Sequence, residues 1–403
     1  MKKLIFLALF SPLLGIAQEK GTHFDHESSW EQIKAKAKAE NKYIFVDCFT
    51  TWCGPCKYMT ANIFPQEKVG AFMNENFINV KVQMDKTPND NEFVKSWYAD
   101  ADKIASQHQI MAYPTFLVFA PNGEIADRFV GGREADQLIE VCKDALVPER
   151  QYYTQLKKYP EHRNDTAFLR KLSVLALEKY DQAALDSVFQ QYLAIQPNIY
   201  NPGTLDLIMQ STSSSKSKGF DILLKNADKV NKVMGKDAAE NKLVSIATIE
   251  ELRSSGASKE KVPDWAAFDK SVRGKYPRIA DETVAKAKCM YYSAFRDDKE
   301  TVKSITSYMK KFGHKSNPYE LNEYAWTVFE MGNAEADLKE ALNWSKRSIE
   351  KEENPNYIDT YANLLFKLGK KDEAIAWEEK ALNAVPDNQK KTFAETLAKM
   401  KGN

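Results

Sequence analysis

The sequence predicts an α/β domain, in which a mixed sheet is flanked by helices, followed by an all-α domain of helical repeats. Helix-like and strand-like segments alternate over residues 22–147, whereas over residues 149–403 only the i, i+3, i+4, i+7 apolar spacing of helices continues. Gly and Pro, with 16 and 15 residues, are each about 4% of the chain, below the usual ~7% and ~5%, which favours long helices. At about 150 residues per domain, the 403 residues predict two or three domains.

The first domain, residues 22–147, consists of short elements with clear boundaries. Ser28 and Ser29 can cap an opening helix, Pro121-Asn122-Gly123 is a hairpin turn, and Gly131-Gly132 breaks the chain ahead of a closing helix. After an opening strand, we expect strands over residues 43–49, 77–84, 115–119 and 124–130. Helices are expected after Ser29, from Cys53 past Met59, over residues 102–108 and over residues 134–146.

The second domain, residues 149–403, contains an internal repeat that is clearest over residues 318–387. One copy has Tyr324-Ala325, Met331-Gly332, Ala341, Trp344 and Pro355, and the next has Tyr361-Ala362, Leu368-Gly369, Ala374, Trp377 and Pro386. The pattern resembles the tetratricopeptide repeat, although Glu378 stands where an aromatic residue is usual. The resemblance implies stacked helix pairs, with the last helix as a cap. The Ser-rich stretch over residues 211–219 is either a helix–helix loop or a flexible linker.

Composition excludes several classes of protein. Lys plus Arg is 57 and Asp plus Glu is 56, so the net charge is +1, and the main electrostatic argument for binding nucleic acid or an anionic membrane is missing. Hydrophobic residues make up 43% of the chain, which is enough to build cores and excludes global disorder. Five cysteines are too few for a disulfide scaffold.

Residues 1–17 are predicted to be a signal peptide. Lys2 and Lys3 precede an apolar run from Leu4 to Ala17, which is shorter than the ~20 residues that cross a bilayer. Small residues at Gly15 and Ala17 predict cleavage after Ala17. The alternative is a buried N-terminal helix. A signal peptide predicts an exported protein without membrane insertion, in a compartment where disulfides persist.

Cys53 and Cys56 are the most informative residues. They are separated by two residues at the start of a helix that follows a strand. The free N–H groups and the positive dipole of a helix start favour the thiolate of Cys53, which lowers its pKa from about 8.5 into the range of roughly 3.5–7.5. Cys53 can then attack a disulfide, and Cys56, one turn further on, can resolve the mixed disulfide.

Two other interpretations of this cysteine pair are a zinc site and a static structural disulfide. A zinc site needs further ligands, and the remaining cysteines, Cys48, Cys142 and Cys289, form no second pair of this spacing. His23 and His26 are spaced like ligands, but they stand in a short leading segment. A static structural disulfide is the other alternative, and the exposed helix start argues against it. We therefore expect redox use of the pair, with no metal and no cofactor.

Two further positions near the pair carry chemistry. Asp47 stands inside an apolar strand, where an acid is costly without a role or a partner. Burial should raise its pKa and make it a proton acceptor for Cys56, unless it is a solvated residue at the edge of the sheet. Pro114 follows Tyr113 ahead of a buried strand, where a trans bond that opens the strand is the default. Lys57 either biases the local field or is a plain surface residue.

Residues 43–147 resemble thioredoxin. The resemblance rests on Asp47, on the motif Trp52-Cys53-Gly54-Pro55-Cys56-Lys57, on Pro114 before a buried strand and on Gly131-Gly132 before the last helix. It implies that Cys53 is the nucleophile, Cys56 the resolving cysteine and Asp47 the buried acid. It also implies a cis Pro114 and a substrate-facing surface, with Lys57 as an accessory residue. That surface comprises Trp52, Gly54, Pro55, Tyr113 and Pro114. With the export signal, the chain is similar to periplasmic thioredoxin-like proteins of Gram-negative bacteria, which implies a location in the periplasm.

The chain also departs from the thioredoxin pattern. Phe49 replaces a usual Trp, and Ala61 stands where many thioredoxins have a helix-kinking Pro. An extra segment around residues 91–99 is expected to pack as one more helix near the active face. Cys48 is interpreted as a buried strand thiol, with a third redox cysteine as the alternative. Cys142 and Cys289 are interpreted as core residues.

These features predict an exported thiol-disulfide oxidoreductase that reduces or exchanges protein disulfides, while its helical domain selects protein partners. Gly54-Pro55 resembles reducing thioredoxins more than strong oxidants. The expected partners are protein disulfide substrates and a membrane or periplasmic electron donor, with no nucleic acid. The alternative is a periplasmic protein-interaction adaptor with incidental redox activity.

Overall fold

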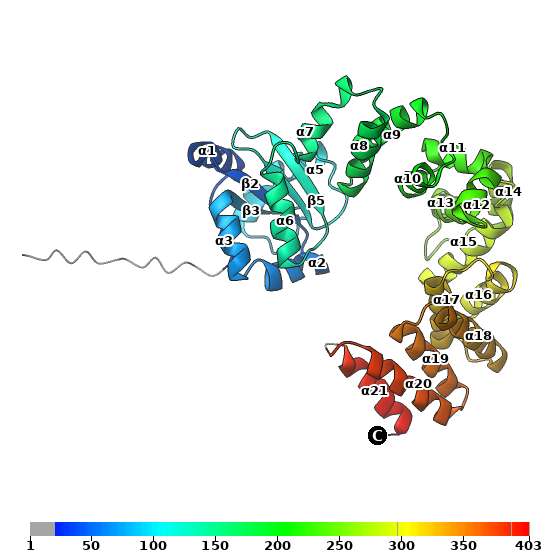
Figure 1. The fold of residues 1–403 in the computed structure, drawn as a ribbon. Coiled ribbons are helices and arrows are strands. Elements are labelled where there is room, and N and C mark those ends of the chain that lie inside the picture. The colour runs from blue at the N-terminus through cyan, green and yellow to red at the C-terminus, as the bar shows by residue number, and fades with distance from the viewer. Residues whose placement is uncertain (1–20, 296, 388, 403) are drawn as a thin grey trace, which may run out of the picture. The chain divides into compact units, whose positions relative to one another are not determined.

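The computed structural model describes residues 21–402 except 296 and 388 (Figure 1). The predicted signal peptide, residues 1–17, lies outside the described residues. The chain divides into two compact units, the first ending at Pro197 and the second beginning at Asn198.

Within the described residues of the first unit, five strands form one mixed sheet in the order β1-β3-β2-β4-β5. The strands are β1 (Phe24–Asp25), β2 (Tyr43–Phe49), β3 (Phe77–Gln83), β4 (Thr115–Phe119) and β5 (Ile125–Val130). The pairs β1–β3 and β2–β3 are parallel, and the pairs β2–β4 and β4–β5 are antiparallel. The predicted strands over residues 43–49 and 115–119 are confirmed to the residue, and the other two are one residue shorter than predicted.

Helices cover both faces of this sheet because the side chains of β2 alternate between two cores. Phe45 packs with Met59 and Leu138 in one core, whereas Val46 packs with Trp30 and Ile104 in the other. The helices of this part are α1 (Trp30–Glu40), α2 (Gly54–Tyr58), the π-helix η1 (Met59–Ile63), α3 (Glu67–Asn76), α4 (Glu92–Ser96), α5 (Tyr98–Gln107) and α6 (Ala135–Ala145). The expected extra helix is α4, and α3 is an element that the sequence analysis did not predict.

Four more helical elements belong to the first unit. They are α7 (Tyr152–Lys157), the short 3-10 helix η2 (Tyr159–Glu161), α8 (Thr166–Glu178) and α9 (Gln182–Ile195). Lys179, at the end of α8, forms an ion pair with Asp127 of β5, whose side chain is buried. The Tyr152 backbone N–H donates to the same carboxylate at 3.4 Å, and the Tyr152 hydroxyl donates to Asp181 at 3.0 Å. These contacts place α7–α9 with the first unit, whereas the sequence analysis assigned all residues after 149 to a separate helical domain.

The described residues of the second unit form helices joined by loops, with no strand among them. Its helices are α10 (Pro202–Ser211), α11 (Lys218–Lys225), α12 (Ala227–Met234), α13 (Ala238–Ser254), α14 (Trp265–Lys275), α15 (Ala280–Phe295), α16 (Asp298–Phe312), α17 (Pro318–Met331), α18 (Glu335–Lys351), α19 (Pro355–Lys367), α20 (Lys371–Ala384) and α21 (Lys390–Lys401). The Ser-rich stretch connects α10 to α11 inside this unit, and the Ser215 N–H donates to Glu250 at 3.0 Å. It is therefore a helix–helix loop.

The predicted repeats are the helix pairs α17–α18 and α19–α20. Ala341, Ala374 and Ala381 are fully buried, as expected where two helices touch. Gly369 ends α19 with a positive φ of 78°, a conformation that favours glycine. Glu378 of α20 is also fully buried in place of the usual aromatic residue.

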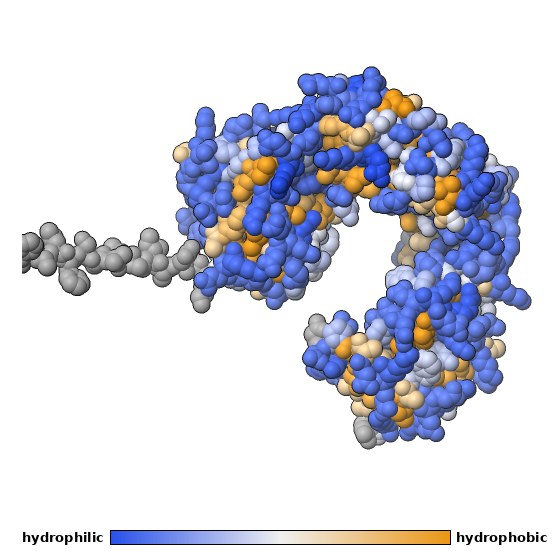
Figure 2. Space-filling model, viewed as in Figure 1, coloured by the Kyte–Doolittle hydropathy of each residue, from blue (hydrophilic) through white to orange (hydrophobic). Residues whose placement is uncertain are grey.

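The visible surface is mostly hydrophilic, with small hydrophobic patches between charged side chains (Figure 2). None of the described helices combines the length and apolarity needed to cross a membrane.

Candidate active site at the Cys53–Cys56 pair

The cysteine pair lies where the central strand β2 passes into α2. Cys53 is the N-cap residue of α2, and the Cys56 backbone N–H donates to the Cys53 Sγ at 3.1 Å. The two sulfurs form a disulfide. The helix thus directs an N–H group at Cys53 and places Cys56 one turn further along, as the spacing predicts.

The surface around the disulfide is aromatic and partly open. Both cysteines are only 3% exposed in the disulfide form, whereas Trp52 is 68% exposed. The Trp52 and Tyr113 rings meet edge to face with centroids 5.9 Å apart. The Tyr113–Pro114 bond is cis, as the resemblance implies, and the Pro114 carbonyl accepts from the Gly131 N–H at 2.8 Å. The structure therefore brings together Trp52, which precedes the disulfide, and Tyr113, which precedes the cis bond.

The remaining predicted residues lie on α2. A Cβ atom at Gly54 would meet nothing within 4 Å, so this residue leaves the start of the helix open. Pro55 is exposed, and a Cβ atom at Gly132 would lie 3.8 Å from its ring. Lys57 is an exposed residue of the same helix.

Asp47 is buried in β2 and is only 1% exposed, so it is not a solvated edge residue. It pairs in register with Lys81 of β3, whose Nζ lies 2.5 Å from the Asp47 Oδ2. The Asp47 Oδ1 has no hydrogen-bond partner among the described residues. Burial raises the pKa of the Asp47 carboxyl group, and the positive charge of Lys81 opposes part of that increase.

Lys81 and Thr60 are candidate site residues that sequence analysis did not identify. The Lys81 Nζ donates to the Thr60 Oγ1 at 3.0 Å, and that hydroxyl donates to the Cys56 carbonyl oxygen at 3.0 Å. The buried acid is thus connected to the backbone of the second cysteine through two side chains. The available signal was Lys81 itself, the one charged residue of the strand Phe77–Gln83.

A π-helical turn follows the site where many thioredoxins have a kinking proline. The turn η1 includes Ala61, and the sulfur of its first residue, Met59, accepts from the Arg133 N–H at 3.3 Å. Helices bend at such insertions. This chain therefore changes its helix geometry after the cysteine motif without a proline.

The other cysteines are buried free thiols. Cys48, Cys142 and Cys289 are at most 2% exposed, and burial raises the pKa of each thiol. Such thiols are poor nucleophiles near neutral pH. No group of three or more His, Cys, Asp or Glu residues in the described part of the chain is arranged to hold a metal ion.

A mixed sheet, a disulfide at a helix start, a buried acid in the strand that leads to it and a cis proline define a thiol-disulfide oxidoreductase. A family model described as a thioredoxin-like domain matches residues 30–146. Thioredoxin of Mycoplasmoides gallisepticum is 32% identical over 121 residues, which cover 30% of this chain and 98% of that protein. The chain belongs to the thioredoxin family.

The chain is also similar to a plant thioredoxin and to a solved helical-repeat domain. Chloroplastic thioredoxin Y of Oryza sativa is 32% identical over 119 residues, which cover 30% of this chain and 58% of that relative. The chain therefore spans little more than half the length of that relative. A solved tetratricopeptide-repeat domain aligns with 66% of this chain and 85% of its own length, with 13% identity and a TM-score of 0.26.

Proposed function

We propose that this protein is an exported, periplasmic thiol-disulfide oxidoreductase that reduces or exchanges disulfides in protein substrates, and that its helical region selects them. The observation that carries the redox part is the Cys53–Cys56 disulfide at the start of α2, beside the exposed Trp52. The apolar run at residues 4–17 supports export. The many helices after α6 support a role in selecting partners, because stacked helices offer extended surfaces for proteins.

The reaction starts from the reduced pair. The Cys53 thiolate attacks one sulfur of a substrate disulfide, forms a mixed disulfide and releases the other substrate sulfur as a thiolate, which takes a proton. Cys56 then loses its thiol proton to Asp47 through water and attacks the Cys53 sulfur. The second substrate thiolate leaves, and the Cys53–Cys56 disulfide remains. The substrate has gained two electrons, and a membrane or periplasmic donor must return two electrons to the pair.

Asp47 suits the proton transfer because of its surroundings. Its raised pKa brings the carboxyl group closer to the operating pH, where a general base is most effective. Lys81 keeps the ionised form accessible inside the core. Without a cation nearby, a carboxylate this deeply buried would stay protonated and could not accept a proton.

A trapping experiment tests the proposal. Cys56→Ala should leave Cys53 able to form mixed disulfides that are no longer resolved, so protein partners accumulate on Cys53 in the native envelope and are identified by mass spectrometry. Cys53→Ala is the matched control and should trap none. Equal trapping by both variants, or none by Cys56→Ala, would contradict the enzyme reading and favour an adaptor that binds partners without redox chemistry.

A truncation separates chemistry from selection. The shortened chain must end after Pro197 rather than after residue 147, because Asp127 of β5 loses its ion pair if α8 and the following Lys179 are removed. We expect residues 21–197 to reduce a generic disulfide protein such as insulin at the full-length rate. With Cys56→Ala, the same fragment should trap a broader or different set of partners. An identical set with an identical yield would show that the second unit does not select substrates.

A further inference from the structure

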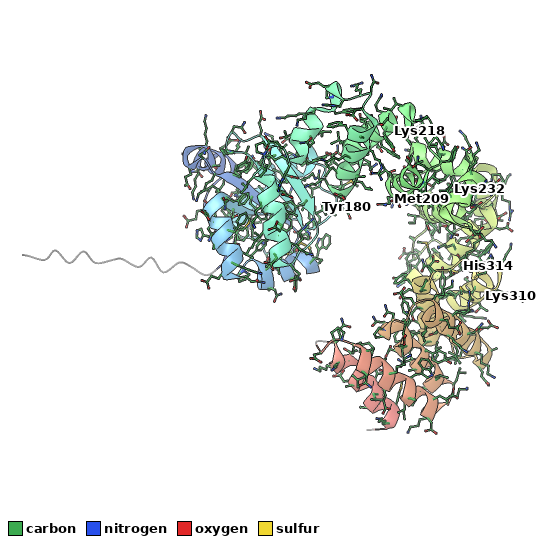
Figure 3. All side chains as sticks on the ribbon, viewed as in Figure 1. Tyr180, Met209, Lys218, Lys232, Lys310 and His314 are labelled. Carbon is green, nitrogen blue, oxygen red and sulfur yellow. A yellow bond between two sulfur atoms is a disulfide. The ribbon has the colours of Figure 1, made fainter. Side chains whose placement is uncertain are left out.

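A pocket in the second unit has the features of a binding site that the redox chemistry does not use. It has a volume of about 360 Å³ and is lined by residues of α10, α13, α15, α16 and α17. That volume is within the range of roughly 300–1,000 Å³ that is usual for ligand pockets. Met209 of α10, labelled in Figure 3, is one of its lining residues.

The charges that line the pocket are paired with one exception. Lys315 lies 2.7 Å from Glu282, and Lys286 lies 2.8 Å from Glu320. Asp237 also approaches Lys315, at 4.0 Å, but it does not line the pocket. Lys242 of α13 has no hydrogen bond and no ion pair with any described residue. The pocket therefore contains ion pairs that are already formed and one cation without an anion.

The Glu282–Lys315 pair is well enclosed, whereas the side chains of Lys286 and Glu320 are 17% and 28% exposed. The side chains of Glu282 and Lys315 are 6% and 15% exposed, and the Tyr308 hydroxyl donates to Glu282 at 3.4 Å. Rearranging these pairs to serve Lys242 would leave another buried charge unpaired, which is costly. Partial burial lowers the pKa of the Lys242 ammonium, so the protein itself does not compensate this charge.

Exposed apolar side chains continue from the pocket along the same helix faces. Ile249 lies one helical turn beyond Ser245 of the pocket lining, and Met290 lies one turn beyond Lys286. Ile249 is 47% exposed and Met290 is 40% exposed. A ligand that fits both features carries a negative charge next to apolar groups, as an acidic side chain in an otherwise apolar peptide does.

We propose that this pocket binds a peptide segment of a partner protein through an acidic side chain that pairs with Lys242, with neighbouring apolar side chains against Ile249 and Met290. The proposal deepens the partner-selection part of the proposed function. It does not depend on the cysteines, so it is tested in the full chain carrying Cys53→Ala and Cys56→Ala. A failure of peptide binding in this chain would not count against the proposed redox activity. A failure of the redox proposal would likewise leave the peptide-binding result valid.

The probe is a pair of peptide pools. Each pool contains blocked nonapeptides with randomised Leu, Ile, Val, Ser and Gly around one central residue, which is Glu in one pool and Gln in the other. Peptides retained by the protein on size exclusion are quantified by mass spectrometry. We expect retention of the Glu pool to exceed that of the Gln pool by about tenfold or more, the effect of one charge-assisted hydrogen bond. Equal retention of the two pools would overturn the proposal.

Substitutions of Lys242 test whether the preference for the Glu pool arises in this pocket. Lys242→Met should remove the preference for Glu and raise the melting temperature, because an unpaired, partly buried charge is lost. Lys242→Glu should reverse the charge preference, so that this variant retains a pool with a central Lys better than the pool with a central Glu. The matched control is Lys288→Met. Lys288 also has no carboxylate partner among the described residues, but it lines a different pocket, where its Nζ lies 5.5 Å from the centroid of the Trp265 ring. An unchanged preference in Lys242→Met, or its loss in Lys288→Met, would contradict the assignment.

Competition with a small dicarboxylate tests whether the apolar side chains of the peptide contribute to binding. Glutarate carries the same charged group without neighbouring apolar side chains. It should displace the Glu pool only at a concentration about tenfold or more above that of the peptides, because it lacks the buried apolar area. Displacement at equal concentration would show a site for free small anions and would overturn the peptide assignment.

Discussion

Buried carboxylates of the two units lie in two opposite surroundings. Glu282 of the second unit has a lysine beside it, as the buried acids of the first unit do, whereas Glu378 of the second unit does not. In the first unit, Asp47 and Asp127 each lie beside a lysine, Lys81 and Lys179 respectively. In the second unit, Glu378 is fully buried and lies beside another acid, Asp359. Burial and the charge of Asp359 raise the pKa of Glu378 to about 8. A buried acid with a lysine can ionise inside the protein, whereas a buried acid next to an acid keeps its proton.

This difference separates two uses of a buried acid. At the active site, a carboxyl group that can both lose and accept a proton is useful for catalysis. In the repeat, Glu378 occupies a packing position between α19 and α20, and its protonated form is the one that the interface tolerates. The comparison predicts that removing the lysine beside a buried acid destabilises the first unit. Replacing Glu378 by a residue that cannot ionise should stabilise the second unit.

The largest expected effect comes from Lys179→Met. It leaves Asp127 buried without its cation, which should lower the free energy of unfolding of the first unit by roughly 3 kcal/mol. Urea unfolding of the full chain measures it. The control is Lys157→Met, whose pair with Glu124 is exposed and should matter by less than about 0.5 kcal/mol. Equal effects would show that the first unit does not depend on its buried ion pair.

Asp47→Asn should slow resolution of the mixed disulfide by about tenfold to a hundredfold, because it removes the proposed proton acceptor for Cys56. In the native protein this step should accelerate as the pH rises through the raised pKa of Asp47, and the variant should lack that rise. Stopped-flow measurements across pH test both points. A wild-type pH profile in the variant would exclude Asp47 as the acceptor.

Glu378→Gln tests the opposite case. Because the folded pKa is about 8 and the ordinary value is 4.5, the stability that protonated Glu378 contributes is complete below about pH 4.5 and is lost as the pH rises toward 8. The variant should therefore match the native chain at pH 4.5 and be more stable at pH 8.5 by several kcal/mol, because one pKa unit corresponds to about 1.4 kcal/mol. Urea unfolding of the second unit at both pH values gives the answer. Glu379→Gln, an exposed neighbour paired with Lys401, should show no such pH dependence.

Trp52→Ala should have the smallest effect. Trp52 is mostly exposed, so the stability of the first unit should not change, while KM for protein disulfides should rise about fivefold through the loss of one aromatic contact. Steady-state reduction of insulin measures KM. Tyr180→Ala removes another exposed aromatic ring of the same unit (labelled in Figure 3) and should leave KM unchanged. A similar rise in both variants would argue against Trp52 as a substrate contact.

Local sequence determined much of the first unit. The strands β2 and β4 were predictable to the residue because an apolar run between turn residues has few alternatives. The position of Cys53 at the start of α2 follows from the same local pattern. The burial of Asp47 follows from its neighbours in β2. Each of these properties depends on residues that are close together in the sequence.

Only the tertiary structure decided the partners of the buried charges. Asp47 and Lys81 are 34 residues apart and meet through the register of β2 and β3, which no local pattern specifies. Lys179 reaches Asp127 across 52 residues, and this contact places α7–α9 with the first unit. Lys242 is left without a partner only because the helices around it pair their other charges with one another. Composition and periodicity determine which segments are buried, but the meeting of distant side chains depends on packing.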